Sequence, residues 1–135
     1  NEPIGVTAHV IPWNYPLSTA ARGIAPALAA GCTVVAKPVE QTPLTALLLA
    51  QIIQAAGFPT GVVNVVTGTG SQAGASLVGH AGVDHVTFTG SVATGINVMR
   101  NAAEQTTRLL LELGGKSPLL VLADADLDLA VDGVM

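Results

Sequence analysis

The chain has 135 residues, enough for one domain with a hydrophobic core and too few for two. Half of the residues are hydrophobic and only 10% are charged, whereas an ordinary soluble domain carries roughly 25% charge, so the chain has little polar surface of its own. The net charge of -4 argues against a nucleic-acid-binding surface, and the longest apolar run, residues 44–50, is too short to span a membrane.

The cysteine content and the ends of the chain place it in context. A single cysteine, Cys32, excludes a disulfide framework and predicts a reducing compartment, the cytoplasm. The chain starts at Asn1 without a charged and apolar leader, and it stops at Met135 inside an apolar stretch. We therefore expect it to be a piece of a longer protein.

Short β-branched runs bounded by Gly and Pro alternate with longer Ala- and Leu-rich stretches, which predicts strands alternating with helices. The expected strands are residues 4–11, 33–36, 62–66, 85–88, 109–111 and 119–122, and the expected helices are residues 16–30, 42–56, 71–79 and 91–103. Because the strands are apolar almost throughout, they should be parallel and covered on both faces. The sequence thus predicts an α/β fold with an open, mostly parallel, Rossmann-like sheet and helices on both faces.

Two of the expected helices carry recognisable end signals. Thr42 is a candidate N-cap with Pro43 in the first turn, and Gly57 with Pro59 should end the same helix. Pro26 lies within the preceding helix, so that helix is expected either to kink or to begin late.

Two glycine-containing turns are candidate phosphate sites. Gly68, Gly70 and Ala73 match the dinucleotide fingerprint between a strand and a helix, but no acidic residue follows at about 20 residues, and a plain turn gives the same pattern. Gly90 and Ser91 lie between a strand and a helix whose free N–H groups suit a pyrophosphate oxygen. Ser91 can equally be only the N-cap of that helix.

Four ordered motifs resemble those of the aldehyde dehydrogenase superfamily: PWNYP at residues 12–16, AGCTVVAKPVE at 30–40, FTGS at 88–91 and LELGGK at 111–116. The resemblance covers the chain from about Pro3 to its end. It implies that residues 1–135 are the partial NAD-binding domain of a longer enzyme, with the catalytic and oligomerisation segments absent. Such an enzyme oxidises an aldehyde to a carboxylic acid through a cysteine thioester.

The resemblance implies two catalytic residues in this chain. Asn14 matches the oxyanion donor, although an Asn between Trp and Tyr-Pro can also simply form a turn. Glu112 matches the general base, and as the only acid in an apolar strand it is expected to be buried, which would make it a stronger base. The nucleophilic cysteine of the family follows the Glu motif at a position beyond Met135, whereas Cys32 matches a structural position, so the chain alone is expected to be inactive.

The resemblance also implies an NAD site. Lys37 and Glu40 match the pair that binds the adenine ribose hydroxyls, and Glu40 should repel the 2′-phosphate of NADP; otherwise the two form a surface ion pair. The other implied cofactor-binding residues are Ile11, Pro12, Trp13, Gly70, Phe88, Thr89, Gly90, Ser91, Leu113 and Gly114.

Alternative functions and partners stay open at this point. A semialdehyde or acyl-phosphate reductase of the same superfamily, or a non-catalytic nucleotide-binding module, would share many of these features. Arg22, the one basic residue near Asn14, is either an ordinary surface residue or a contact for an acidic substrate tail. The expected partner is a small aldehyde, with no nucleic acid and no membrane, and the parent protein should be a homodimer or homotetramer.

No metal site is expected. Asp124, Asp126 and Asp128 begin like a calcium loop, but Leu129 stands where that loop needs glycine. We expect the acidic cluster to cap a helix that enters at Leu127 instead. The three histidines have no partners at metal-ligand spacing.

Overall fold

The computed structural model describes residues 2–116 and 118–134. The strands are β1 (Val6–Ile11), β2 (Thr33–Pro38), β3 (Val63–Val65), β4 (His85–Gly90) and β5 (Arg108–Leu113). The helices are α1 (Pro16–Ala29), α2 (Leu44–Ala55), α3 (Ala75–Val78), α4 (Val92–Ala103) and α5 (Leu127–Val134), and a π-helical turn, η1 (Gly70–Gly74), leads into α3.

The five strands form one parallel sheet in the order β3-β2-β1-β4-β5. The chain winds outward from β1 through β2 to β3 and then returns to place β4 on the other side of β1. The strand order therefore reverses between β1 and β4, and in open α/β sheets ligands bind at this switch point, beyond the carboxyl ends of the strands.

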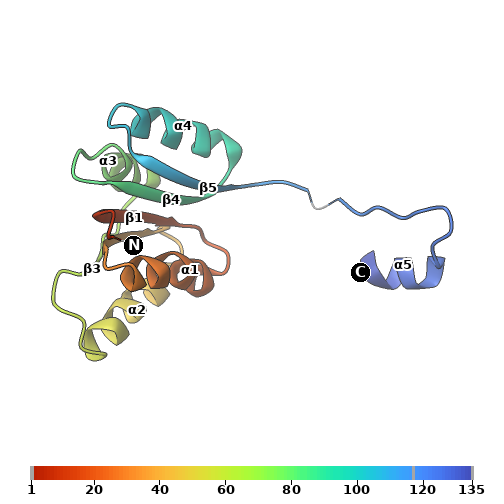
Figure 1. The fold of residues 1–135 in the computed structure, drawn as a ribbon, viewed down its shortest axis with the longest axis horizontal. Helices are drawn as coiled ribbons and strands as arrows, with labels where there is room; N and C mark the ends of the chain where they lie inside the picture. Colours follow the sequence, from red (N-terminus) through yellow and green to blue (C-terminus); the bar gives the residue numbers. More distant parts are fainter. Residues whose placement is uncertain (1, 117, 135) are drawn as a thin grey trace.

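Helices cover both faces of the sheet, as predicted (Figure 1). On one face α1 and α2 pack on β1, β2 and β3, and on the other α4 packs on β4 and β5 with α3 beside it. Small side chains at Ala20, Ala36 and Ala46 let the first layer approach closely, while Val86 and Phe88 contribute to the core under α3 and α4. The α/β fold class is confirmed.

The helix beginnings differ from the predictions in two places. The prediction that Thr42 caps α2 is wrong, because the N-cap position is Pro43 and the Thr42 hydroxyl donates to the carbonyl oxygen of Trp13 at 3.5 Å. Helix α1 starts at Pro16 rather than late, because proline is well suited to the first helical position. Pro26 lies inside α1, so the carbonyl group of Arg22 lacks the usual N–H partner there.

The helix expected at residues 71–79 is divided. Gly70 to Gly74 form the π-helical turn η1, capped by the Thr69 side chain, and only four residues of α3 follow. Glycine has a low helix propensity, and two glycines at this spacing explain why a regular α-helix does not start here.

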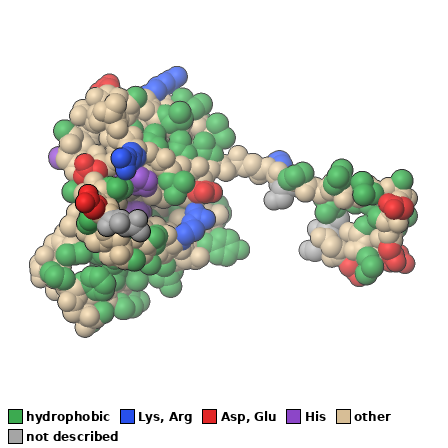
Figure 2. Space-filling model, viewed as in Figure 1, with side chains coloured by type: hydrophobic (Ala, Val, Ile, Leu, Met, Phe, Trp, Pro, Cys, Tyr) green, Lys and Arg blue, Asp and Glu red, His purple; other side chains and the backbone are tan. Residues whose placement is uncertain are grey.

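The strand expected at residues 119–122 is absent, and that prediction is wrong. The exposed residues 118–126 lead to α5, which lies apart from the sheet (Figure 1), so in the described part of the chain residues 119–122 have no neighbouring strand to pair with. Asp126 caps α5 as predicted, accepting from the N–H groups of Asp128 and Leu129 at 3.0 and 3.2 Å. Figure 2 shows apolar side chains along this segment and on α5. Across the described residues, no helix has the length and apolar character needed to cross a bilayer.

Candidate functional site

A cleft of about 1100 Å³ lies at the carboxyl edge of the parallel sheet. All the catalytic and cofactor-binding residues that the resemblance implied line it: Ile11, Pro12, Trp13, Asn14, Lys37, Glu40, Gly70, Phe88, Thr89, Gly90, Ser91, Glu112, Leu113 and Gly114. Parallel pairing explains this, because the carboxyl ends of all five strands meet at one edge. Residues up to about 100 positions apart in sequence thus face one space.

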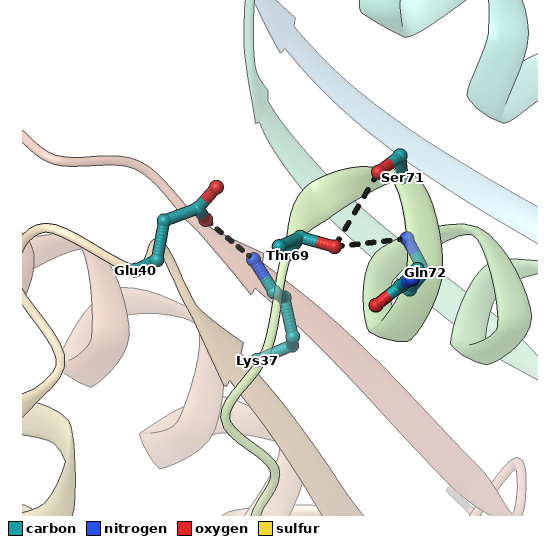
Figure 3. Close-up of polar contacts among 5 residues, drawn as sticks. All are labelled: Lys37, Glu40, Thr69, Ser71 and Gln72. Atoms are coloured by element: carbon teal, nitrogen blue, oxygen red, sulfur yellow. Dashed lines mark hydrogen bonds and ion pairs between the residues drawn. The ribbon is translucent and has the colours of Figure 1, made fainter.

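Lys37 and Glu40 form an ion pair in the cleft, with 3.4 Å between Nζ and Oε2 (Figure 3). The Lys37 side chain is only 2% exposed, whereas that of Glu40 is 44% exposed. Hydrogen bonds from the Glu40 backbone N–H, the Lys37 ammonium and the Gly70 N–H hold the pKa of Glu40 below its usual value, although desolvation opposes them. The pair is therefore not a surface ion pair: it joins a buried cation to a carboxylate that faces the cleft.

The turn before η1 leaves open space in the cleft near Lys37. Gly68 has a φ of 148°, and a Cβ there would overlap the side chain of Ala73, so the turn needs glycine at this position. The Thr69 hydroxyl accepts from the N–H of Gln72 at 3.3 Å and fixes the turn (Figure 3). No atom lies within 4 Å of a Cβ built on Gly70, so that glycine faces open space in which a ligand can approach the backbone.

Ser91 is the N-cap of α4, as one of the two open interpretations expected. Its Oγ accepts from the N–H of Thr94 at 3.2 Å. By helix geometry, the N–H groups of Val92 and Ala93 at the start of α4 have no intrahelical acceptor. They follow Ser91, which lines the cleft, so capping by Ser91 and phosphate binding at the start of α4 are compatible.

Asn14 lies in the turn between β1 and α1. It is exposed, and the next residue, Tyr15, has the left-handed backbone conformation with φ 48° and ψ 47°. That conformation is uncommon for a bulky residue, and it reverses the chain directly after Asn14. The carbonyl oxygen of Trp13 accepts from Thr42, which ties this turn to the segment after β2.

Glu112 lies in β5, but it is exposed rather than buried, and the expected burial is wrong for the described residues. Alternation along the strand explains the difference. Leu109 and Leu111 pack toward the core beneath α4, whereas Glu112 points to the opposite face together with Leu110, which is 50% exposed. In the described part of the chain no helix covers that face over β5.

Sequence reasoning missed a polar row on α4. Thr94, Asn97 and Asn101 line the cleft together with Ser91, and their spacing of three or four residues places them on one side of the helix. That spacing was available in the sequence and was the signal that could have identified them. Arg22 also lines the cleft, and its Nη2 donates to Oγ1 of Thr89 at 3.5 Å.

His9 is buried between β1 and α1. The Thr7 hydroxyl donates to the carbonyl oxygen of Thr33 at 3.0 Å, so in its 3.1 Å contact with His9 it must accept from Nε2. The other ring nitrogen, Nδ1, has no partner in the described part of the chain, and a Cβ at Gly23 would overlap it. Burial and then the neighbouring His85 lower the pKa of His9 from 6.5 to about 4.

This buried imidazole predicts a loss of stability in acid. Because the folded state holds His9 neutral down to about pH 4 while the unfolded chain protonates near 6.5, protons favour unfolding between these values. We expect His9 to remove about 3 kcal/mol from the free energy of unfolding as the pH falls through this window. Denaturant unfolding at pH 7 and pH 5 should show a smaller drop for His9→Leu than for the wild type.

His80 is no control for this measurement, because its Nδ1 accepts from the N–H of Gly82 at 2.9 Å and His80→Leu would remove that hydrogen bond. Equal pH slopes for the wild type and His9→Leu would contradict the assignment.

Cys32 lies at the opposite edge of the sheet from Glu112. It is buried, directly before the amino end of β2, whereas Glu112 is near the carboxyl end of β5. This placement fits the structural position expected from the sequence. Over the residues that the structure describes, no group of three His, Cys, Asp or Glu side chains is arranged to hold a metal ion.

Comparison with known proteins places these features in context. The family model described as the aldehyde dehydrogenase family matches residues 1–135. The chain is 58% identical over 131 residues to a hydroxyisobutyraldehyde dehydrogenase of Mycolicibacterium austroafricanum, covering 97% of this chain and 26% of the relative. It is 52% identical over 133 residues to an aldehyde dehydrogenase of Enchytraeus buchholzi, covering 98% and 27%.

Solved structures agree in fold. A crystal structure of betaine aldehyde dehydrogenase from Staphylococcus aureus in complex with NAD+ matches with a TM-score of 0.93 and 50% identity, covering 97% of this chain and 26% of that one. An aldehyde dehydrogenase from Bartonella henselae matches with a TM-score of 0.92 and 41% identity, covering 98% and 28%. The chain thus spans about a quarter of the length of the proteins it matches.

Proposed function

Because the chain belongs to the aldehyde dehydrogenase family, we propose that it supplies the cofactor site, an oxyanion donor and a general base to an NAD-dependent enzyme. The reaction converts an aldehyde, NAD+ and water into a carboxylate, NADH and two protons. The observation that carries the proposal is that all the catalytic and cofactor-binding residues implied by the resemblance line one cleft at the carboxyl edge of the sheet.

The residues of the cleft fit a dinucleotide. The buried Lys37 ammonium offers donors to ribose hydroxyls, Gly70 lets a ligand approach the backbone, and the start of α4 suits a pyrophosphate. Glu40 accepts from a ribose hydroxyl as a carboxylate, and its lowered pKa keeps it charged at neutral pH. The same charge disfavours a 2′-phosphate, so we propose NAD rather than NADP as the cofactor.

The catalytic roles follow from position at the same edge. The nicotinamide, when bound, accepts a hydride from the substrate. Asn14 donates its side-chain N–H to the aldehyde oxygen as negative charge develops there. Glu112 removes a proton from the water that releases the product. The thiolate that attacks the aldehyde carbon comes from a residue outside this chain, because Cys32 is buried at the opposite edge.

Other properties of the whole protein remain proposals. We propose that residues 1–135 form part of its NAD-binding domain, that it assembles as a homodimer or homotetramer, and that it works in the cytoplasm. The aldehyde dehydrogenase relatives, of which this chain covers about a quarter, support the first point. The single cysteine supports a reducing compartment.

Lys37→Met tests the cofactor site. The substitution keeps the length of the side chain and removes its charge, so the hydrogen bonds of a charged donor are lost. We expect the dissociation constant for NAD to rise about tenfold or more in calorimetry on the whole protein. The matched control is Lys116→Met, because Lys116 is exposed.

Two outcomes would count against the proposed function. Unchanged NAD affinity in Lys37→Met would show that Lys37 does not bind the cofactor. A whole protein that binds NAD but forms no NADH with any aldehyde would instead support the non-catalytic nucleotide-binding module. The dissociation constants for NAD and NADP, measured on the wild type and on Glu40→Gln, test the cofactor preference. The ratio of the two constants should be closer to one in the variant.

A further inference from the structure

The polar row on α4 has no part in the chemistry described so far. Asn97 is exposed and Asn101 is half-buried, and both line the cleft. Thr94 is bonded to Ser91 at 2.9 Å, whereas the two amides form no hydrogen bond with any other described residue. Each amide has two N–H donors and one carbonyl acceptor. These groups are therefore available to a ligand in the cleft.

The proposed dinucleotide site decides which part of the ligand reaches this row, so the inference rests on the proposed function. The pyrophosphate lies at the start of α4, and the adenosine ribose lies at Lys37 and Glu40. Asn97 follows Val92, the first residue of α4, after a rise of about 8 Å along the helix axis. An extended adenosine reaches a comparable distance from its phosphate, so Asn97 is within reach of the base.

The wall that joins the ribose contacts to α4 is small and apolar. A Cβ built on Gly74 in η1 would lie 3.9 Å from Cδ of Lys37, so η1 passes close to the lysine proposed to bind the ribose. Helix α3 follows η1 and packs beside α4 (Figure 1). Ala75, Val78 and Val98 line the cleft there. An apolar wall suits the flat face of a purine, but it does not distinguish one purine from another.

Such a distinction requires polar groups that match the edge of the base. The edge of adenine presents an amino group, which donates, next to a ring nitrogen, which accepts. A side-chain amide matches this pair, because it can accept and donate at the same time. Arg100 also lines the cleft, but a guanidinium only donates and cannot accept from the amino group. The two asparagines therefore have the chemistry that the edge of adenine needs.

We propose that Asn97 and Asn101 hydrogen-bond the edge of the adenine and make the site selective for adenine over purines that carry an oxygen in place of its amino group. The carbonyl oxygen of an amide accepts from the amino group, and its N–H donates to the neighbouring ring nitrogen. In hypoxanthine an oxygen replaces the amino group, so the amide loses the donor from which it accepts. The two asparagines thus add recognition of the base to the contacts with the ribose and the pyrophosphate.

Calorimetry on the whole protein that carries this chain tests the proposal, with NAD and nicotinamide hypoxanthine dinucleotide as the two ligands. The ligands differ only in the purine. We expect the wild type to bind NAD about tenfold or more tightly than the hypoxanthine analogue. The double variant Asn97→Leu/Asn101→Leu keeps the approximate size of both side chains and removes both amides. Its two dissociation constants should lie within about twofold of each other.

The matched control is Gln51→Leu, which removes an exposed amide from α2, outside the cleft. It should keep the preference of the wild type. A wild type that binds the two dinucleotides equally would overturn the proposal, and so would a double variant that keeps the preference for NAD.

The proposed function fails in other ways. A wild type that binds NAD selectively but forms no NADH with any aldehyde would contradict the enzymatic role, while the two dissociation constants would still decide the role of the asparagines. A wild type that binds neither dinucleotide would overturn the cofactor site and the recognition of adenine together.

Discussion

Glu112→Gln should slow steady-state turnover by about 10²- to 10⁴-fold and leave the first burst of NADH intact. The amide has the shape of the carboxylate but cannot take a proton from water. Hydride transfer precedes the hydrolysis that needs this base, so one equivalent of NADH should form per active site before turnover stalls. Rapid mixing of the whole protein with NAD and an aldehyde separates the burst from the steady state.

The matched control for this substitution is Glu104→Gln. Glu104 is exposed at the end of α4, outside the cleft, so its loss removes the same charge elsewhere. It should leave both the burst and the steady state unchanged. A Glu112→Gln variant that also loses the burst would show that Glu112 acts before hydride transfer, which contradicts its assignment as the base for hydrolysis.

The sequence predicted the layers of the fold and the edge that carries the site. Apolar runs such as residues 34–36 of β2 indicated parallel strands covered on both faces, and short links between strands and helices then required the carboxyl ends to meet. The pairing of Thr89 with Glu112 could not be predicted in this way, because it depends on the register between two strands. The contact of Arg22 with Thr89 could not be predicted either, because it depends on how α1 lies over the sheet.

Errors in the sequence interpretation arose where partners far along the chain decide the structure. Residues 119–122 have the composition of a strand, yet a strand forms only where a neighbour accepts its hydrogen bonds. Thr42 has the right residue type for a cap, but its hydroxyl donates to the carbonyl oxygen of Trp13 instead.

The error about the burial of Glu112 is of another kind, because the sequence contained the signal that would have prevented it. Alternation along β5 places Glu112 on the face opposite to Leu109 and Leu111, which pack toward the core.

Asn14→Ala should reduce kcat by about 10²- to 10³-fold, a loss of about 2.7–4 kcal/mol of transition-state stabilisation. The side-chain amide is the proposed donor to the aldehyde oxygen, where negative charge develops when the thiolate attacks. This step precedes hydride transfer, so the burst itself should slow, in contrast to Glu112→Gln. Rapid-mixing measurements of NADH formation under the same conditions distinguish the two variants.

Two further variants separate the donor from the turn that holds it. Asn14→Asp keeps the shape and removes the N–H donor, so it should be at least as slow as Asn14→Ala. Tyr15→Phe keeps the bulk of the neighbouring left-handed residue, which is 79% exposed, and should leave the rates unchanged. If Asn14→Asp retained the wild-type burst rate, Asn14 would serve only the turn between β1 and α1. The stabilisation of the oxyanion would then have to come from backbone N–H groups or from residues outside this chain.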